Sequence, residues 1–251
     1  MDKRIGAQLY TLRDFTQTKE DFEKSMKRVH DIGYKAVQIS AVGPIAPEDM
    51  REICQRYDLA IACTHKGFDD YVSRPDEMID FHKKLGCDIA GLGAMPGEYR
   101  SLEKIPELVE KLNHVTDEMA KQGITFAYHN HHFEFERMEN GQFIMDYMIE
   151  HGKFDFIVDV YWLAVAGLNP AEYIRKMGKR AVVIHYKDLA IVNYEVVMAE
   201  VMEGNLDWEA IIAASRDAGS RWAMVEQDVC RRDPFESLEI SYKNLTKKGF
   251  I

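Results

Sequence analysis

The chain alternates eight times between a short apolar run and a segment whose apolar residues recur at helical spacing. This alternation restricts the fold more than any other feature of the sequence, because strands that alternate with helices form a parallel sheet covered by those helices. The runs begin about 25 to 40 residues apart, as expected for strand–helix units with their loops. They are Arg4–Tyr10, Lys35–Ser40, Leu59–Thr64, Asp88–Ala94, Ile124–Asn130, Phe154–Val160, Ala181–Lys187 and Trp222–Asp228.

The intervening segments carry helix signals at their faces and ends. Phe22, Met26 and Val29 fall on one face of a helix, and Gly33 follows as its predicted C-terminal cap. Near the end of the chain, Asp233 precedes Pro234, which is the order typical of an N-cap and a first helical residue. The sequence therefore predicts helices between the strands.

Eight such units in 251 residues fit a closed (β/α)₈ barrel. An open sheet that binds dinucleotides would carry a Gly-x-Gly-x-x-Gly turn after its first strand. That turn here reads Leu9-Tyr10-Thr11-Leu12-Arg13-Asp14, without glycine. We therefore predict an α/β fold, a (β/α)₈ TIM barrel that forms one domain over residues 1–251.

Charge and cysteine content exclude several classes of function. The chain has 32 Lys and Arg against 42 Asp and Glu, a formal net charge of −10, which argues against nucleic-acid binding. No run approaches the roughly 18 apolar residues of a membrane span. The four cysteines are scattered without a Cys-x-x-Cys pair, as expected for reduced thiols. We expect a cytoplasmic protein that binds neither nucleic acid nor membrane.

Metal-capable side chains stand at the ends of the last four strand runs. His129, Asp159, His185 and Glu226 stand at these ends, and the ends of barrel strands carry the active site. Taken singly, Asp159 also fits a helix cap and His185 a hydrogen-bonded structural residue. Glu226 follows a buried run and needs a partner charge or a metal. We expect Asp159, His185 and Glu226 to converge on one point.

These donors are nitrogen and oxygen without sulfur, a set that suits Mn²⁺, Mg²⁺, Co²⁺ or Zn²⁺. Such an ion binds two neighbouring sugar oxygens and stabilises an enediolate. A carboxylate beside the bound carbon then removes and returns a proton, which gives isomerisation or epimerisation. With a leaving group at the next carbon, the same site gives elimination.

Six motifs in order along the chain resemble the sugar phosphate isomerase/epimerase family of xylose-isomerase-like TIM barrels, whose members include ketose 3-epimerases, hydroxypyruvate isomerase and inosose dehydratase. The resemblance covers essentially the whole chain. Its motifs are Gln8–Asp14, Tyr128–Phe135, Asp159–Trp162, His185–Asp188, Glu203–Trp208 and Val225–Asp228.

The resemblance implies one divalent ion held by Glu, Asp, His and Glu from the last four strands. Asp159, His185 and Glu226 match the second, third and fourth ligands. At the first position this sequence has His129, and the nearest carboxylate is Glu134, five residues on. We favour Glu134 over His129 as the ligand, because a carboxylate is also basic enough to move the proton. Glu134 and Glu226 are therefore the predicted catalytic residues.

The remaining site residues are also carried over from the resemblance. Gln38 stands where related sequences often have a glutamate. No glycine-rich phosphate cradle follows the last two strands, so a phosphorylated substrate is not indicated. The predicted substrate-binding residues are Tyr10, His65, His129, His131, Trp162 and Lys187.

The sequence thus predicts a divalent-metal-dependent isomerase or epimerase acting on a small sugar or keto-sugar. A lyase or dehydratase acting on a keto-sugar or keto-glycoside is the alternative. A hydrolase resembling the endonucleases of the same superfamily is disfavoured by the negative charge. A barrel that binds sugars without catalysis stays open. Phe81, Tyr173 and Trp208 fit either burial within the barrel or contact with a second copy in a homo-oligomer.

Overall fold

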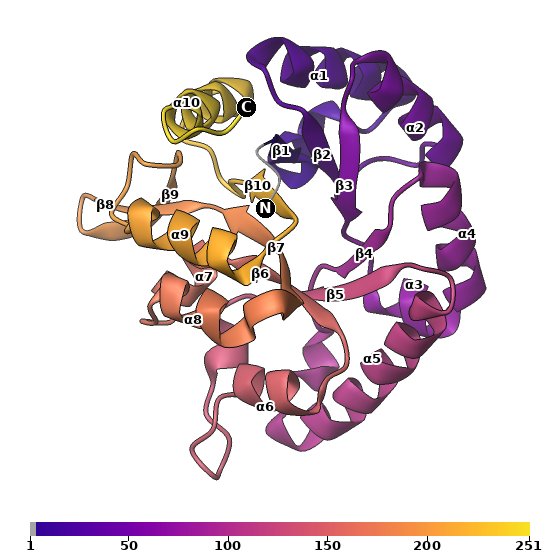
Figure 1. The fold of residues 1–251 in the computed structure, drawn as a ribbon, viewed down its shortest axis with the longest axis vertical. Helices are drawn as coiled ribbons and strands as arrows, with labels where there is room; N and C mark the ends of the chain where they lie inside the picture. Colours follow the sequence, from indigo (N-terminus) through magenta and orange to yellow (C-terminus); the bar gives the residue numbers. More distant parts are fainter. Residues whose placement is uncertain (1–3) are drawn as a thin grey trace.

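Eight parallel strands form a ring at the centre of the molecule, with helices around it, as Figure 1 shows for the computed structural model, which describes residues 4–251. Each strand lies within one of the eight apolar runs, so the predicted α/β fold and (β/α)₈ barrel are confirmed. The strands are β1 (Ile5–Gln8), β2 (Ala36–Ile39), β3 (Ala60–Thr64), β4 (Ile89–Leu92), β5 (Thr125–His129), β6 (Asp155–Asp159), β7 (Ala181–Tyr186) and β10 (Trp222–Val225).

The helices bury the apolar faces that their spacing predicts. Phe22, Met26 and Val29 of α1 are fully buried, and Gly33 ends this helix at a φ of +122°, which a side chain would disfavour. The α-helices are α1 (Lys19–Ile32), α2 (Pro47–Arg56), α3 (Phe68–Ser73), α4 (Pro75–Leu85), α5 (Ile105–Ala120), α6 (Ile144–His151), α7 (Val160–Val165), α8 (Pro170–Met177), α9 (Trp208–Ala218) and α10 (Pro234–Thr246). The 3₁₀ turns are η1 (Leu9–Phe15), η2 (Gly97–Tyr99), η3 (Leu102–Lys104), η4 (Phe133–Phe135) and η5 (Gly178–Arg180).

The ring closes between β3 and β4. Its strand order is β3-β2-β1-β10-β7-β6-β5-β4, and the two end strands meet just beyond β3. There the backbone N–H of Lys66 donates to the Gly91 carbonyl at 2.9 Å, and that of Gly93 donates to the Lys66 carbonyl at 3.3 Å. A Cβ on Gly91 would lie 2.1 Å from the Thr64 carbonyl oxygen, so this close approach requires glycine.

Alternation along the strands sets which side chains enter the ring. Val37, Val158 and Val225 belong to the large core cluster that includes the helices, whereas the residue just before each of them belongs to a second, smaller cluster. Successive strand residues point to opposite faces. Gln38, Asp159 and Glu226 each stand two positions after a member of the smaller cluster, so their side chains point inward at the carboxyl end of the ring.

An antiparallel hairpin interrupts the strand–helix alternation between β7 and α9. It consists of β8 (Asp188–Val192) and β9 (Glu195–Ala199) and lies outside the ring in Figure 1. Asn193 and Tyr194, both at positive φ, connect its two strands, as in the tight turns of hairpins. The sequence pattern did not predict this hairpin.

Two of the aromatic residues considered for an oligomer interface are buried within this chain. Tyr173 is 7% exposed and Trp208 is 6% exposed. Their burial is therefore explained without a second copy. Among the described residues, no helix combines the length and the apolar character needed to cross a bilayer.

Candidate active site

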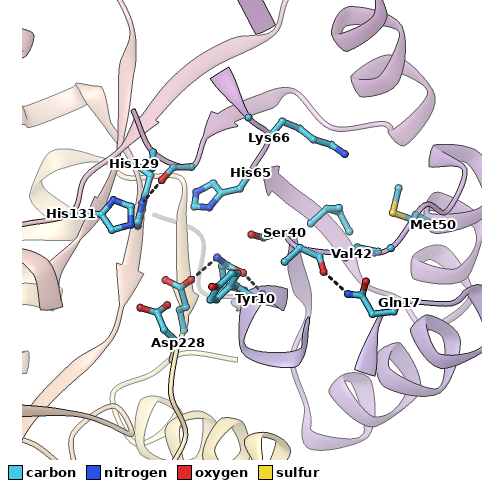
Figure 2. Close-up of a pocket in the computed structure, with 18 of the residues that line it drawn as sticks. Tyr10, Gln17, Ser40, Val42, Met50, His65, Lys66, His129, His131 and Asp228 are labelled. Atoms are coloured by element: carbon cyan, nitrogen blue, oxygen red, sulfur yellow. Dashed lines mark hydrogen bonds between the residues drawn. The ribbon is translucent and has the colours of Figure 1, made fainter. Parts of the chain in front are cut away.

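A pocket of about 920 Å³ opens at the carboxyl ends of the strands. It contains all six residues that the sequence predicts to bind substrate: Tyr10, His65, His129, His131, Trp162 and Lys187. Figure 2 shows His129 and His131 at one end of the pocket, His65 and Tyr10 in the middle, and Val42 of the β2–α2 loop towards the other end. The structure therefore brings together side chains from the first, third, fifth, sixth and seventh strand ends.

Four buried side chains form a cluster at the pocket, and two of them, His129 and Glu226, line it. The cluster consists of His129, Asp159, His185 and Glu226, and one nitrogen or oxygen atom from each lies within 4.8 Å of the others. His129 ends β5, Asp159 ends β6, His185 lies in β7, and Glu226 follows β10. Two imidazole nitrogens and two carboxylate oxygens at these separations are a donor set suited to a divalent ion.

Each carboxylate of the cluster has one oxygen fixed by the protein and the other directed inward. Asp159 Oδ1 accepts hydrogen bonds from the backbone N–H groups of Tyr161 at 2.9 Å and Trp162 at 3.2 Å. Glu226 Oε1 accepts from Gln8 Nε2 at 2.6 Å. Asp159 Oδ2 and Glu226 Oε2 remain for the centre of the cluster. Asp159 is thus both the N-cap of α7 and a member of the site.

The two histidines are oriented in the same way. His129 Nδ1 donates to the Gly93 carbonyl at 3.0 Å, and His185 Nε2 donates to Gln38 Oε1 at 2.8 Å. Metal-ligating histidines usually make such an outer hydrogen bond, which fixes the ring and its tautomer. The four residues therefore fit a divalent ion. Gln38 acts here as the acceptor for His185.

Lys187 places an ammonium group inside this cluster. Its Nζ lies 3.0 Å from Asp159 Oδ2, 2.9 Å from Glu226 Oε2 and 3.1 Å from Asp228 Oδ1, and the side chain is 1% exposed. Burial would lower the pKa of Lys187, but the three carboxylates outweigh it and raise that pKa. The lysine is therefore charged and neutralises the same oxygens that would hold a metal ion.

The charges of the cluster depend on one another. Burial alone would raise the pKa values of Asp159 and Glu226, but the Lys187 ammonium and the neighbouring histidines together outweigh it and hold both below their ordinary values. For His185, burial lowers the pKa, yet Glu226 and Asp159 prevail and raise it. Both carboxylates are therefore ionised at neutral pH.

Glu134, the favoured first ligand in the sequence prediction, is not brought into the cluster. It is fully buried in η4, where its carboxylate accepts hydrogen bonds from the Tyr128 hydroxyl at 2.5 Å and the backbone N–H of His131 at 2.8 Å. Burial raises the pKa of Glu134 to about 7. The structure places the alternative residue, His129, with the other three members of the cluster.

Three pocket residues present polar atoms that have no partner within the described part of the chain. They are His65 Nε2, His131 Nδ1 and Trp162 Nε1. Burial lowers the pKa of His131 to about 3 and that of His65 well below its ordinary value, so both imidazoles are neutral. Buried polar atoms are normally hydrogen-bonded. These atoms are suited to the hydroxyl groups of a polar ligand.

Comparison with known proteins agrees with this architecture. The family model described as "xylose isomerase-like TIM barrel" matches residues 26–239. A search of curated proteins gives no match. Solved structures with low sequence identity share the fold. A sugar phosphate isomerase/epimerase from Parabacteroides distasonis has a TM-score of 0.82 and 24% identity, with 99% of each chain covered.

Two further structures have other activities in their names. A probable 3-DHS dehydratase from Bacillus anthracis has a TM-score of 0.74 and 13% identity over 97% of this chain and 98% of the other. A D-allulose 3-epimerase from Methylomonas has a TM-score of 0.69 and 15% identity over 99% and 98%. At these identities the likeness concerns the fold. The match of the family model over most of the chain shows that this protein belongs to the xylose isomerase-like TIM barrels.

Proposed function

We propose that this protein is a divalent-metal-dependent isomerase or epimerase of a small keto-sugar. The observation that carries the proposal is the cluster of His129, Asp159, His185 and Glu226, which borders a pocket with unpartnered polar atoms. His129 is a better first ligand than Glu134, because the Glu134 carboxylate is already held by Tyr128 and His131. When bound, a divalent ion supplies positive charge beside the substrate oxygens on which negative charge develops.

The chain's own residues can hold and move the proton. Glu226 lines the pocket in its ionised form, and its carboxylate is the base that removes a proton from the carbon next to the keto group. Asp228 also lines the pocket, and burial together with Glu226 raises its pKa, so it is the second group able to exchange a proton. His65 and His131 bind hydroxyl groups as neutral imidazoles.

The test is turnover of ketopentoses and ketohexoses in D₂O with Mn²⁺, with products identified by mass and by NMR. A proton exchanged at the reacting carbon leaves deuterium there. Glu226→Gln should lower the rate at least about a hundredfold, as expected for loss of a positioned base. Glu98→Gln, a change at an exposed glutamate, is the matched control. Full turnover by Glu226→Gln would refute the assignment of the base.

A lyase or dehydratase is the second candidate, and the Lys187–Asp228 pair favours it. The Lys187 ammonium and the Asp228 carboxyl lie beside Glu226, so a proton donor adjoins the base. Such a donor can protonate an oxygen that leaves from the neighbouring carbon. The structurally similar probable dehydratase is consistent with this chemistry. Mass decides between the candidates, because elimination releases water or an alcohol and isomerisation conserves mass.

A further inference from the structure

We propose that the end of the pocket beside β2 and α2 is a subsite for an apolar, ring-sized substituent attached to the sugar. We call this end the outer arm. This inference rests on the proposed function, since it assumes that the sugar itself binds at the cluster. The wall of the outer arm consists of Ile39, Ala41, Val42, Pro44, Ile45 and Met50.

The pocket is elongated, with the outer arm at the end away from the catalytic residues. In Figure 2, His129, His131 and Asp228 lie on one side of the pocket, and Val42 and Met50 lie on the other. Ser40 and His65 lie between the two ends. A ligand that reaches both ends therefore extends from the cluster past the end of β2.

The two ends of the pocket differ in chemistry. The unpartnered polar atoms belong to residues near the cluster, whereas the outer arm is walled by aliphatic side chains and methionine. The Gln17 amide at this end already donates to the Ala41 carbonyl at 2.8 Å. Among the described lining residues, no carboxylate belongs to the outer arm. An apolar group would gain free energy by replacing water there.

An anionic substituent such as a phosphate fits this end poorly. The one cation at its edge, Lys66, lies 4.4 Å from the centre of the Phe81 ring, and burial lowers its pKa. The neighbouring backbone N–H of Gly67 is already donated to Asp70 at 3.0 Å. Sites for phosphate normally present several converging N–H donors or an Arg fork. The outer arm presents neither.

The wall of the outer arm is formed within the chain. The backbone N–H of Gly43 donates to the Thr16 carbonyl at 3.1 Å, and a Cβ on Gly43 would lie 2.0 Å from the Gln17 carbonyl oxygen. Met50, on α2, is only 2% exposed. The loop that carries Val42 is thus packed tightly against the segment after η1. An apolar substituent would enter a site that is already shaped.

The size of the pocket supports a ligand larger than one sugar. Pockets of roughly 300–1,000 Å³ usually hold ligands the size of drug molecules. The pocket here, at about 920 Å³, is at the upper end of that range. A single sugar ring bound at the cluster would leave the outer arm unfilled. The remaining space is large enough for a substituent of at least one further ring.

The test compares ligands that differ only in the substituent. Isothermal titration calorimetry would measure the affinities of methyl and phenyl β-D-glucopyranoside, the corresponding galactosides, and free phenol for the whole protein with Mn²⁺. We expect the phenyl glycosides to bind about tenfold or more tightly than the methyl glycosides, the scale of discrimination typical of an apolar pocket. In Val42→Asp, a change at a half-buried wall residue, this ratio should fall towards one.

Val196→Asp is the matched control, because it adds the same charge at a half-exposed valine of the β8–β9 hairpin. This variant should retain the phenyl preference. Equal affinities of methyl and phenyl glycosides, or a phenyl preference that Val42→Asp leaves intact, would refute the proposal that the outer arm binds an apolar substituent. If neither glycoside binds, the assumption that the sugar binds at the cluster fails, and the titration with phenol alone tests the apolar subsite. Phenol binding that Val42→Asp abolishes supports the subsite, and absence of phenol binding refutes it.

Discussion

In each member of the buried cluster, one polar atom is hydrogen-bonded to the surrounding protein and another faces the centre of the cluster. Asp159 caps α7 with one oxygen and faces Lys187 with the other. Asp159 is therefore a helix cap that also belongs to the buried cluster. The same division holds for His185, which donates from Nε2 to Gln38 and faces Glu226 with Nδ1.

Lys187 controls how much negative charge is left for a metal ion. Its ammonium lies within 3.0 Å of Asp159 Oδ2 and Glu226 Oε2, and two cations at such short range repel each other. We expect Lys187→Met to raise the affinity for Mn²⁺ at least about tenfold. The same variant should be less stable than wild type without metal, because two buried carboxylates lose their counter-ion. Titration calorimetry and urea unfolding measure the two effects.

Lys66→Met is the control for this prediction. Lys66 lies in the same pocket but packs over Phe81 and is not among the cations that pair with the cluster. Its removal should leave the affinity for Mn²⁺ within about threefold of wild type. Weaker Mn²⁺ binding by Lys187→Met than by wild type would contradict the repulsion argument and make the lysine a support of the metal site.

Glu134 should make the protein less stable as the pH rises. Burial raises its pKa from an ordinary 4.5 to about 7, so between these values the folded protein holds a proton that the unfolded chain releases. The free energy of unfolding therefore falls across this window, by about 3 kcal/mol in total. Glu134→Gln, which carries no ionisable proton, should lose this part of the decline. Urea unfolding of both proteins at pH 5 and pH 8 measures it, and parallel pH dependences would refute it.

The sequence could identify the members of the cluster that lie at strand ends. Inward residues at the carboxyl ends of barrel strands must meet, so Asp159, His185 and Glu226 could be predicted from position alone. The role of Glu134 depended on the path of the loop after β5. In that loop, η4 directs the carboxylate to Tyr128 and away from the cluster. The apolar periodicity of the sequence does not predict such a turn.

At the scale of elements, Asp188 organises the connection between β7 and α9. Its carboxylate accepts hydrogen bonds from the backbone N–H groups of Leu189, Met202, Gly204 and Leu206 and from the Trp208 indole. Lys187 thus lines the pocket, whereas the adjacent Asp188 fixes the segment that follows the β8–β9 hairpin.

Asp188→Ala should destabilise the protein by about 3 kcal/mol or more, because it leaves several buried donors without an acceptor. Asp207→Ala is the matched comparison. Asp207 caps α9 through one hydrogen bond to the backbone N–H of Ala210, and its loss should cost about 1 kcal/mol. Equal losses in the two variants, measured by urea unfolding, would contradict an organising role for Asp188.

The β8–β9 hairpin shows why some elements could not be predicted. Its strands are only partly buried, and Tyr194 at its turn is fully exposed. The apolar periodicity that revealed the barrel strands comes from burial on two faces. A hairpin that lies on the surface is not constrained in this way. Its turn residues, Asn193 and Tyr194, carry a weaker signal than Asn-Gly.

At the scale of the whole molecule, the folding of the barrel brings the four residues of the cluster together. The members of the cluster come from β5, β6, β7 and the end of β10, which are neighbours in the ring although about 100 residues separate His129 from Glu226. The regular alternation of strands and helices was sufficient to predict this ring. A ligand that joins these four strands therefore stabilises the folded chain as a whole.

Metal binding should consequently raise the unfolding temperature. At a Mn²⁺ concentration about 100 times its dissociation constant, linkage gives about 2.7 kcal/mol, which corresponds to roughly 5–10 °C for a chain of this size. Asp159→Asn should abolish the shift while it preserves the cap of α7, since asparagine caps helices as well as aspartate does. Asp207→Asn makes the same change at the cap of α9, away from the cluster. Its unfolding temperature should rise with Mn²⁺ as much as that of wild type. Differential scanning calorimetry with Mn²⁺ and with EDTA measures all three proteins. A wild type that does not respond to Mn²⁺, or an Asp159→Asn variant that responds fully, would remove the metal from the proposed function. The Lys187 ammonium, which pairs with Asp159 and Glu226, would then take the place of the metal ion as the counter-charge of these carboxylates.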